Sequence, residues 1–223
     1  MSIDLFIDEL SSYHKKNIFN PWGENCKVSD HHNSLYVRQR NLFSVLNACK
    51  GFSSIDLWVG RDLGWRGGRR TGLSLVDEFS LHSYGNSIGV ADLSKATSDA
   101  PVKERTATEV ELMVREIKQP LFFWNAFPYH PHKEGDNFSN RMHTKEELSV
   151  GLYFLEFLLD LISPRRVVSV GNDAALAVKK IKVESLKVRH PSYGGQTAFR
   201  EQIRDIYGLM PNDSMKKNIP LFA

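Results

Sequence analysis

Short apolar segments alternate with helix-like patterns along most of this sequence, and this alternation is the strongest constraint on its fold. Each strand-like segment is rich in branched and aromatic residues, and helical spacing of apolar residues recurs between them. The four segments are residues 55–60, 121–125, 167–170 and 186–189. Such units favour a mainly parallel sheet with helices on both faces. The sequence therefore predicts an α/β fold of three layers, α-β-α, around a four-stranded parallel sheet. Because no repeat or linker interrupts the pattern, we expect one domain over residues 1–223.

Apolar periodicity and capping signals place the helices. Thr144 and Glu147 form a capping box before a leucine-rich stretch that Pro164 ends. Residues 85–103 and 126–143 are rich in loop-forming residues and show no periodicity, so we expect connections there. Four further helices are expected at residues 3–10, about 35–51, 104–117 and about 197–207. A fifth is expected to begin after Asn172, which would be its N-cap.

The composition is typical of a soluble globular protein: 41% of the 223 residues are hydrophobic, 25% are charged, and the net charge is +3. No apolar run approaches the roughly 18 residues that cross a bilayer. The acids Asp4 and Asp8 are unlike a secretory signal. Cys26 and Cys49 are too few for an iron–sulfur cluster or a four-cysteine zinc site. We therefore expect an intracellular protein with reduced thiols, cytoplasmic or associated with the nucleoid (nuclear in a eukaryote), with no cofactor.

A glycine-rich loop after the first predicted strand carries four arginines against a single acid, Asp62. A charge run is more often a solvated surface, but guanidinium groups and loop amides are also what phosphate oxygens bind. The loop lacks the Gly-Lys-Ser/Thr ending of nucleoside-triphosphate enzymes. We therefore expect this loop to contact phosphate groups. The arginines are Arg61, Arg66, Arg69 and Arg70, interleaved with Gly64, Trp65, Gly67 and Gly68.

Polar residues stand at the ends of all four predicted strands. In parallel sheets of this kind, ligands bind outside the carboxyl ends of the strands. Each residue alone is more simply explained as a turn, cap or strand-end residue, but their joint position predicts one site. The four strand ends read Gly60-Arg61-Asp62, Asn125, Gly171-Asn172 and His190-Pro191-Ser192.

In order and spacing, these motifs resemble the uracil-DNA glycosylase superfamily. The resemblance covers about residues 54–207, and its specific parts are the Gly-x-Asp loop and His-Pro-Ser. It rests on Gly60-Arg61-Asp62-Leu63-Gly64, Thr71-Gly72-Leu73-Ser74-Leu75, Asn125 and His190-Pro191-Ser192. The resemblance implies a four-stranded parallel sheet between helices, and an enzyme that flips a damaged base out of DNA into a pocket at the strand ends.

The resemblance also implies catalytic roles for Asp62 and His190. Asp62 would orient water and stabilise the oxocarbenium-like sugar, as carboxylates do in glycoside cleavage. His190 would donate a hydrogen bond to the base oxygen on which negative charge develops. Asn125 would read the Watson–Crick edge of the base. Gly60, Arg61, Gly64 and Leu75 complete the implied base-binding residues.

The implied DNA contacts come from the arginine loop and from the loop after His190. The DNA-binding residues are Arg66, Arg69, Arg70, Ser192, Tyr193 and Gln196, with Tyr193 or Gln196 entering the duplex where the base has left. No lysine falls in the motifs to form a Schiff base. We therefore expect a monofunctional DNA glycosylase, acting as a monomer, that hydrolyses the N-glycosidic bond and leaves an abasic site.

Two departures from the superfamily pattern bear on the substrate. Gly64 stands where the strictest uracil-excising members carry Tyr, so it leaves room for a substituent at carbon 5. Leu75 stands where many relatives carry a Phe on which the base stacks. We therefore expect a modified or mispaired base, with uracil and 5-substituted pyrimidines as candidates. The stacking ring is then Trp65, Phe79 or Phe127, among which the sequence does not choose.

Other interpretations remain for the histidines and for the function. His130, His132 and His143 have the residue type for zinc, but their spacing is unlike the helical pairs of metalloproteases, so we expect no metal. We favour the segment around His130 as a wall of the base pocket or a phosphate contact. The alternative function is a non-catalytic nucleic-acid-binding module that retains the glycosylase fold. The presence of both Asp62 and His190 favours the enzyme.

Overall fold

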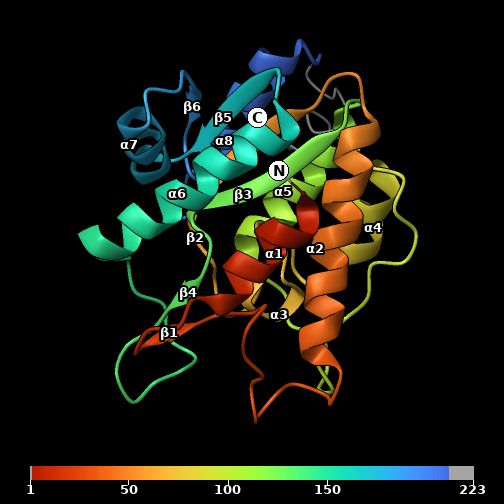
Figure 1. Ribbon diagram of the computed structural model, residues 1–223. Coiled ribbons are helices and arrows are strands. Elements are labelled where there is room, and N and C mark those ends of the chain that lie inside the picture. The colour runs from red at the N-terminus through yellow and green to blue at the C-terminus, as the bar shows by residue number, and fades with distance from the viewer. Residues whose placement is uncertain (1, 211–223) are drawn as a thin grey trace, which may run out of the picture.

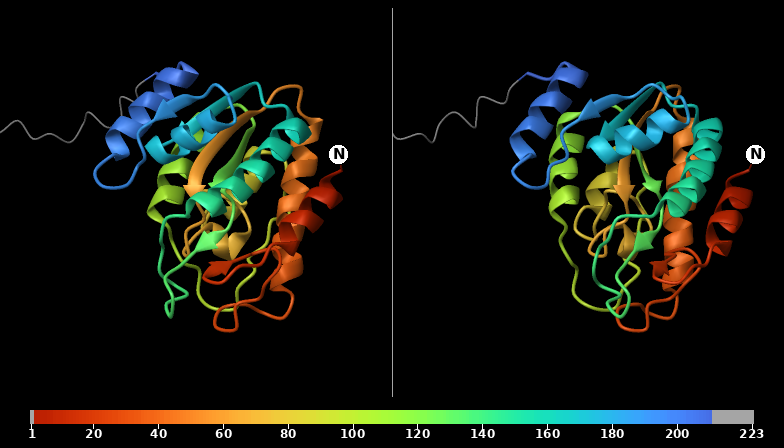
Figure 2. Two further views of the ribbon diagram at one scale, coloured as in Figure 1. Left: turned by 60° about the vertical axis from the view of Figure 1, so that its left-hand side comes forward. Right: turned by 90° about the vertical axis from the view of Figure 1, so that its left-hand side faces the viewer.

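The central sheet consists of the four parallel strands that the sequence predicts. The computed structural model describes residues 2–210 (Figure 1), and the rest of the expected domain lies outside the described residues. The strands are β2 (Asp56–Asp62), β3 (Leu121–Phe127), β5 (Arg166–Val170) and β6 (Leu186–Val188). They lie in the order β3-β2-β5-β6. Because every pairing is parallel, all four carboxyl ends share one edge of the sheet, which faces downward in Figure 2.

Helices cover both faces of this sheet and complete the three layers. One face carries α1 (Ile3–Ser12), α2 (Ser34–Gly51), α6 (Lys145–Ile162) and α7 (Asn172–Lys180). The opposite face carries α4 (Leu81–Ser87), α5 (Arg105–Glu116) and α8 (Gln196–Tyr207). The expected α-β-α fold class is therefore confirmed. No helix within residues 2–210 is long and apolar enough to span a bilayer.

Aromatic side chains from alternate strand positions hold the layers together. On the first face, the ring of Phe6 in α1 lies 5.6 Å from that of Trp124 in β3. On the second face, Trp58 in β2 lies 6.0 Å from Phe199 in α8. All four side chains are buried, and successive residues of a strand point to opposite faces. The apolar strands are therefore buried on both sides, as expected for a covered parallel sheet.

Three short elements near the carboxyl edge were not predicted. β1 (Ile18–Phe19) pairs antiparallel with β4 (His130–Pro131), and α3 (Gly68–Thr71) is a single turn inside the glycine-arginine loop. Each has too few residues to show a period in the sequence. Together they fold the long connections over the edge at which the strands end.

Helix α6 begins as predicted, whereas α7 begins one residue earlier than expected. The Thr144 hydroxyl accepts from the Glu147 N–H, and the Glu147 carboxylate accepts from the Thr144 N–H at 2.8 Å, so the capping box is confirmed. The cap of α7 is Gly171 rather than Asn172. Gly171 has a φ of +94°, and a β-carbon there would lie 3.1 Å from the β-carbon of His190. Glycine therefore allows the close approach of His190.

Candidate active site

A cavity of about 550 Å³ opens at the carboxyl ends of the strands. All predicted catalytic and base-binding residues line it, so the structure brings them together, although their roles remain predictions. These residues are Gly60, Arg61, Asp62, Gly64, Leu75, Asn125 and His190. Of the predicted DNA-binding residues, Ser192 and Tyr193 also line the cavity, whereas Arg66, Arg69, Arg70 and Gln196 do not.

Asp62 is the last residue of β2, and both of its carboxylate oxygens are held. Arg61 Nε donates to Oδ2 at 2.7 Å, and His143 Nδ1 donates to Oδ1. Arg61 is itself fixed by Asp173, to which its Nη1 donates at 3.0 Å. Two hydrogen bonds in different directions leave the Asp62 side chain little rotational freedom. The carboxylate is thus pre-oriented at the cavity, with a cation beside it.

His190 is held in one tautomer by the loop that follows it. The backbone N–H of Ser192 donates to His190 Nδ1 at 3.1 Å, so Nδ1 is an acceptor and Nε2 carries the proton. Burial lowers the pKa of His190, and the nearby charges of Arg61 and Arg189 lower it further. A neutral imidazole that donates through Nε2 is therefore the stable form at neutral pH. It suits a hydrogen bond to an oxygen that gains negative charge.

Asn125, which lies in β3 before its carboxyl end, has a buried side-chain amide whose oxygen is unpaired among residues 2–210. The side chain is 1% exposed, and its Oδ1 forms no hydrogen bond within the described residues. A β-carbon on the neighbouring Gly60 would collide with this oxygen, so glycine is required in β2 at that point. Leaving a buried polar atom unpaired costs about 1–3 kcal/mol. A ligand with a hydrogen-bonding edge would remove this cost.

In the second half of the arginine loop, two arginines that were predicted to contact DNA are buried. Arg70 Nε forms an ion pair with Glu78 at 2.9 Å, and its Nη2 bonds Asp99 and Thr97. Arg69 lies over the ring of Phe19, 4.1 Å from its centre. Both arginines are only 4% exposed, so they do not present their charges to a phosphate backbone.

Arg66 differs from these two arginines. It is exposed, and its guanidinium lies 4.9 Å from the ring centre of Trp65. Of the three arginines predicted to bind DNA, it is the one that is exposed to solvent.

A carboxyl group from another part of the chain lies beside Gly64. A β-carbon on Gly64 would collide with the carboxyl group of Glu104, which lines the same cavity. Glu104 immediately precedes α5 and comes from a distant part of the sequence. A side chain at position 64 would therefore require Glu104 to move, and the expectation that Gly64 leaves space for a carbon-5 substituent stays a prediction.

None of the three candidate stacking rings lines the cavity. Trp65 packs edge-on against Phe138 at 5.7 Å, Phe127 is buried, and Phe79 is 55% exposed. The apolar wall includes Leu75, which has a positive φ of 58° and points toward Gly60. The structure therefore places Leu75, and none of the three candidate rings, at the cavity wall.

The histidines after β3 have structural contacts. His130 is buried, and its Nε2 hydrogen-bonds the Ser139 carbonyl oxygen at 2.9 Å. Burial lowers its pKa to about 3, with the Arg69 charge contributing. Neither His130 nor His132 lines the cavity, so the expected pocket wall at this segment is wrong. Only His143 reaches the site, through Asp62, and the sequence had suggested it only as a possible zinc ligand.

The loop after His190 projects from the cavity rim. Tyr193 is 98% exposed and adopts a φ of +53°, and the following Gly194 has a φ of +75°. A bulky residue held in the left-handed region is unusual, and such strain concentrates at functional sites. The exposed ring is free to contact a partner. Gln196, which begins α8, is partly buried at the base of this loop.

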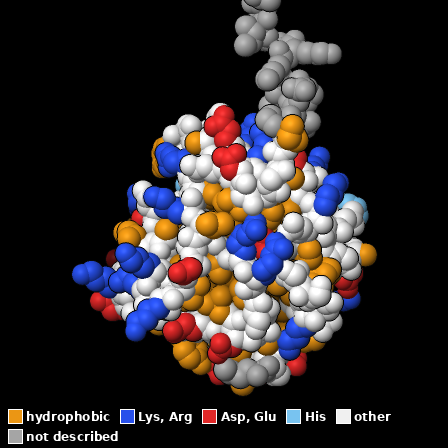
Figure 3. Space-filling view, turned by 90° about the horizontal axis from the view of Figure 1, so that it is seen from above, with side chains coloured by type: hydrophobic (Ala, Val, Ile, Leu, Met, Phe, Trp, Pro, Cys, Tyr) orange, Lys and Arg blue, Asp and Glu red, His pale blue; other side chains and the backbone are white. Residues whose placement is uncertain are grey.

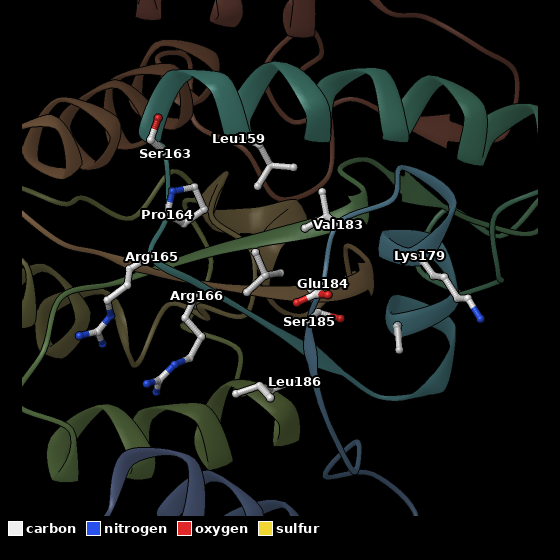
Figure 4. Close-up of a pocket in the computed structure, with 12 residues that line it drawn as sticks. Leu159, Ser163, Pro164, Arg165, Arg166, Lys179, Val183, Glu184, Ser185 and Leu186 are labelled. Carbon is white, nitrogen blue, oxygen red and sulfur yellow. The ribbon is translucent and has the colours of Figure 1, made fainter.

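A larger cavity of about 940 Å³ lies at the opposite edge, where β5 and β6 begin. Figure 4 shows Leu159 and Val183 beside it, with Arg165 and Arg166 pointing away together. Both arginines are paired with the buried Asp56. From above, where the strands begin, acidic and basic side chains are interspersed around apolar hollows (Figure 3). Its described lining includes the acid Glu184 but no amide or imidazole side chain.

The fold is shared with a known protein. The structure is similar to the crystal structure of wild-type SMUG2 from Pedobacter heparinus, with a TM-score of 0.58 and 14% sequence identity. The match covers 92% of this chain and 95% of that chain. No protein-family model and no curated protein sequence matches this chain. The chain therefore has the uracil-DNA glycosylase-like fold that the sequence predicts.

Proposed function

We propose that this protein is a monofunctional DNA glycosylase that binds a flipped base in the 550 Å³ cavity and hydrolyses its N-glycosidic bond. The carrying observation is that Asn125, whose buried amide oxygen has no partner among the described residues, lines the same cavity as Asp62 and His190. An amide offers both a donor and an acceptor, which suits the edge of a nucleobase. The similarity to SMUG2 supports the proposal through the shared fold.

The three side chains can divide the reaction between them. Water attacks the sugar carbon C1′, the bond from C1′ to the base nitrogen breaks, and the electron pair of that bond leaves with the base. Asp62 stabilises the cationic sugar and accepts a proton from the attacking water. His190 Nε2–H donates a hydrogen bond to the base as its negative charge grows. The products are an abasic site and the free base, which takes up the proton.

The rim of the cavity supplies the proposed DNA contacts. Arg66 would bind a backbone phosphate, and the Ser192 hydroxyl and neighbouring amides a second one. Tyr193 is the better candidate for the residue that enters the duplex, because it is far more exposed than Gln196. Its ring would replace the stacking lost when the base leaves. We expect the protein to act as a monomer.

The test is a panel of duplex and single-stranded oligonucleotides. They carry uracil, hypoxanthine, a thymine mispair or a 5-substituted pyrimidine, and alkaline cleavage reports abasic sites. We expect the wild type to release at least one of these bases and Asp62→Asn to release it far more slowly. Binding without release from any oligonucleotide would favour the non-catalytic binding module. If the protein neither binds any of these oligonucleotides nor releases a base from them, the DNA-directed function is refuted.

A further inference from the structure

Glu104 places a further carboxyl group in the cavity, in addition to those of Asp62 and Asp173. Its two oxygens lie against the α-carbons of Gly64 and Gly67, where a β-carbon on either glycine would collide with them. Within residues 2–210, no hydrogen bond or ion pair reaches this carboxyl group. The backbone N–H of Glu104 donates to Asp77 Oδ2 at 2.7 Å, which fixes the residue at the start of α5. The two glycines therefore leave space for a carboxyl group that has no hydrogen-bond partner in the part of the chain that the structure describes.

The surroundings favour the protonated form of this group. Burial raises the pKa of Glu104 to about 7, the nearby Asp77 carboxylate adds to the rise, and Arg66 opposes it. A protonated carboxyl group has an O–H donor and a carbonyl acceptor, like an amide. The other charged or titratable side chains that line the cavity are Arg61, Asp62, Arg141, Asp173, Arg189, His190 and Tyr193.

We propose that Glu104 is a specificity-determining residue, whose carboxyl group forms the wall of the base site beside Gly64 and hydrogen-bonds the bound base there. This inference rests on the proposed glycosylase function. It has two consequences. The carboxyl group limits the size of base that fits, because packed interiors deform little. Its ionisation removes a donor and adds negative charge close to the departing base.

Two variants separate the size effect from the charge effect. Glu104→Gln keeps the volume of the side chain and supplies an N–H donor that does not titrate. Glu104→Ala removes the wall. Glu184→Gln is the matched control, because Glu184 is exposed and lines the other cavity. The measurement is kcat/KM for release of uracil, of 5-substituted uracils and of hypoxanthine from oligonucleotides, between pH 5.5 and 9. Thermal melting of each variant is recorded in parallel.

For the wild type, we expect kcat/KM to fall above pH 7, by at least about threefold more than for Glu104→Gln between pH 7 and 8.5. Groups shared by the two proteins cancel in this comparison. For Glu104→Ala, we expect the ratio of kcat/KM for larger bases to that for smaller bases to rise at least about tenfold. Glu184→Gln should match the wild type in both respects.

The failures of the two proposals are distinguishable. If the wild type releases a base, but Glu104→Gln and Glu104→Ala keep its pH profile and its size selectivity, the role of Glu104 is refuted and the glycosylase function stands. If the wild type releases no base from any oligonucleotide, both proposals fall. If Glu104→Ala does not fold, the near-isosteric Glu104→Gln decides through its pH profile alone.

Discussion

The two halves of the glycine-arginine loop have similar compositions but opposite environments. In the first half, residues 60–64 line the cavity and Arg66 is exposed to solvent. Residues 67–71, which include α3, are buried, and Arg69 and Arg70 lie among aromatic and acidic side chains. The same residue types thus contribute to a surface in one half and to the core in the other.

This difference arises outside the loop itself. Glu78 and Asp99 neutralise Arg70, and Phe19 and Phe138 enclose Arg69. A charge is found buried where counter-charges or aromatic faces compensate for its lost hydration. Where a cluster of arginines points therefore depends on distant residues. We therefore expect variants of the second half to lower the stability of the fold. Variants of the first half should instead lower base release or DNA binding.

The largest effect is expected at Arg70. Arg70→Ala leaves the buried carboxylate of Glu78 without its cation, which should lower the free energy of unfolding by about 3–5 kcal/mol. Urea denaturation measures it. Arg40→Ala is the control, because Arg40 pairs with Asp92 on the surface, with both side chains about half exposed, and should cost less than about 1 kcal/mol. Equal costs for the two variants would remove the distinction between the two halves of the loop.

In contrast to Arg70→Ala, Asp62→Asn should impair base release and leave stability nearly unchanged. We expect base release to slow by at least about 10²-fold, the scale for losing one electrostatic stabiliser, with thermal melting and DNA affinity nearly unchanged. Asparagine retains the shape and can still accept a hydrogen bond from Arg61. Single-turnover release from a duplex substrate and an unfolding curve are measured together. Wild-type release by Asp62→Asn would show that the carboxylate is not catalytic.

His190 extends the comparison to the opposite wall of the cavity. We expect His190→Ala to slow base release by about 10²-fold. Because burial lowers the pKa of His190, the neutral donor should persist as the pH falls through 6.5, and release should decline only in more acidic solution. Comparing the pH profile of base release by the wild type with that by His190→Ala tests whether the pKa of His190 is lowered. A decline centred at or above pH 6.5 that disappears in the variant would contradict it.

The features that the sequence predicted correctly depend on local patterns or on topology. Thr144 and Glu147 are three residues apart, so their capping box is a local property of one helix start. Asn125 and His190 are far apart in sequence, but parallel strands bring their ends to one edge. Pattern and topology therefore suffice to place these residues in one cavity with Asp62.

The features that were missed depend on side chains that meet across the fold. His143 and Glu104 both lie just before helices that run back along the sheet. Chain topology therefore predicts their position near the carboxyl ends of the strands. Their orientations have none: the contact of His143 with Asp62 and the slot for Glu104 between two glycines appear only in three dimensions. For the same reason, the space beside Gly64 could not be judged from Gly64 alone.

The smallest effect, and the one that most directly compares the two halves of the loop, is expected at Arg66. If Arg66 contacts a phosphate, Arg66→Ala should weaken binding to all DNA sequences alike and lower the slope of log affinity against log salt by about one unit. Titration of a labelled duplex at several salt concentrations measures this slope. Arg69→Ala is the matched variant, because Arg69 is buried between Phe19 and Phe138. It should lower the melting temperature and leave the slope of the folded protein unchanged. An unchanged slope in Arg66→Ala, or an equal decrease in both variants, would show that exposure does not decide which arginines of the loop bind DNA.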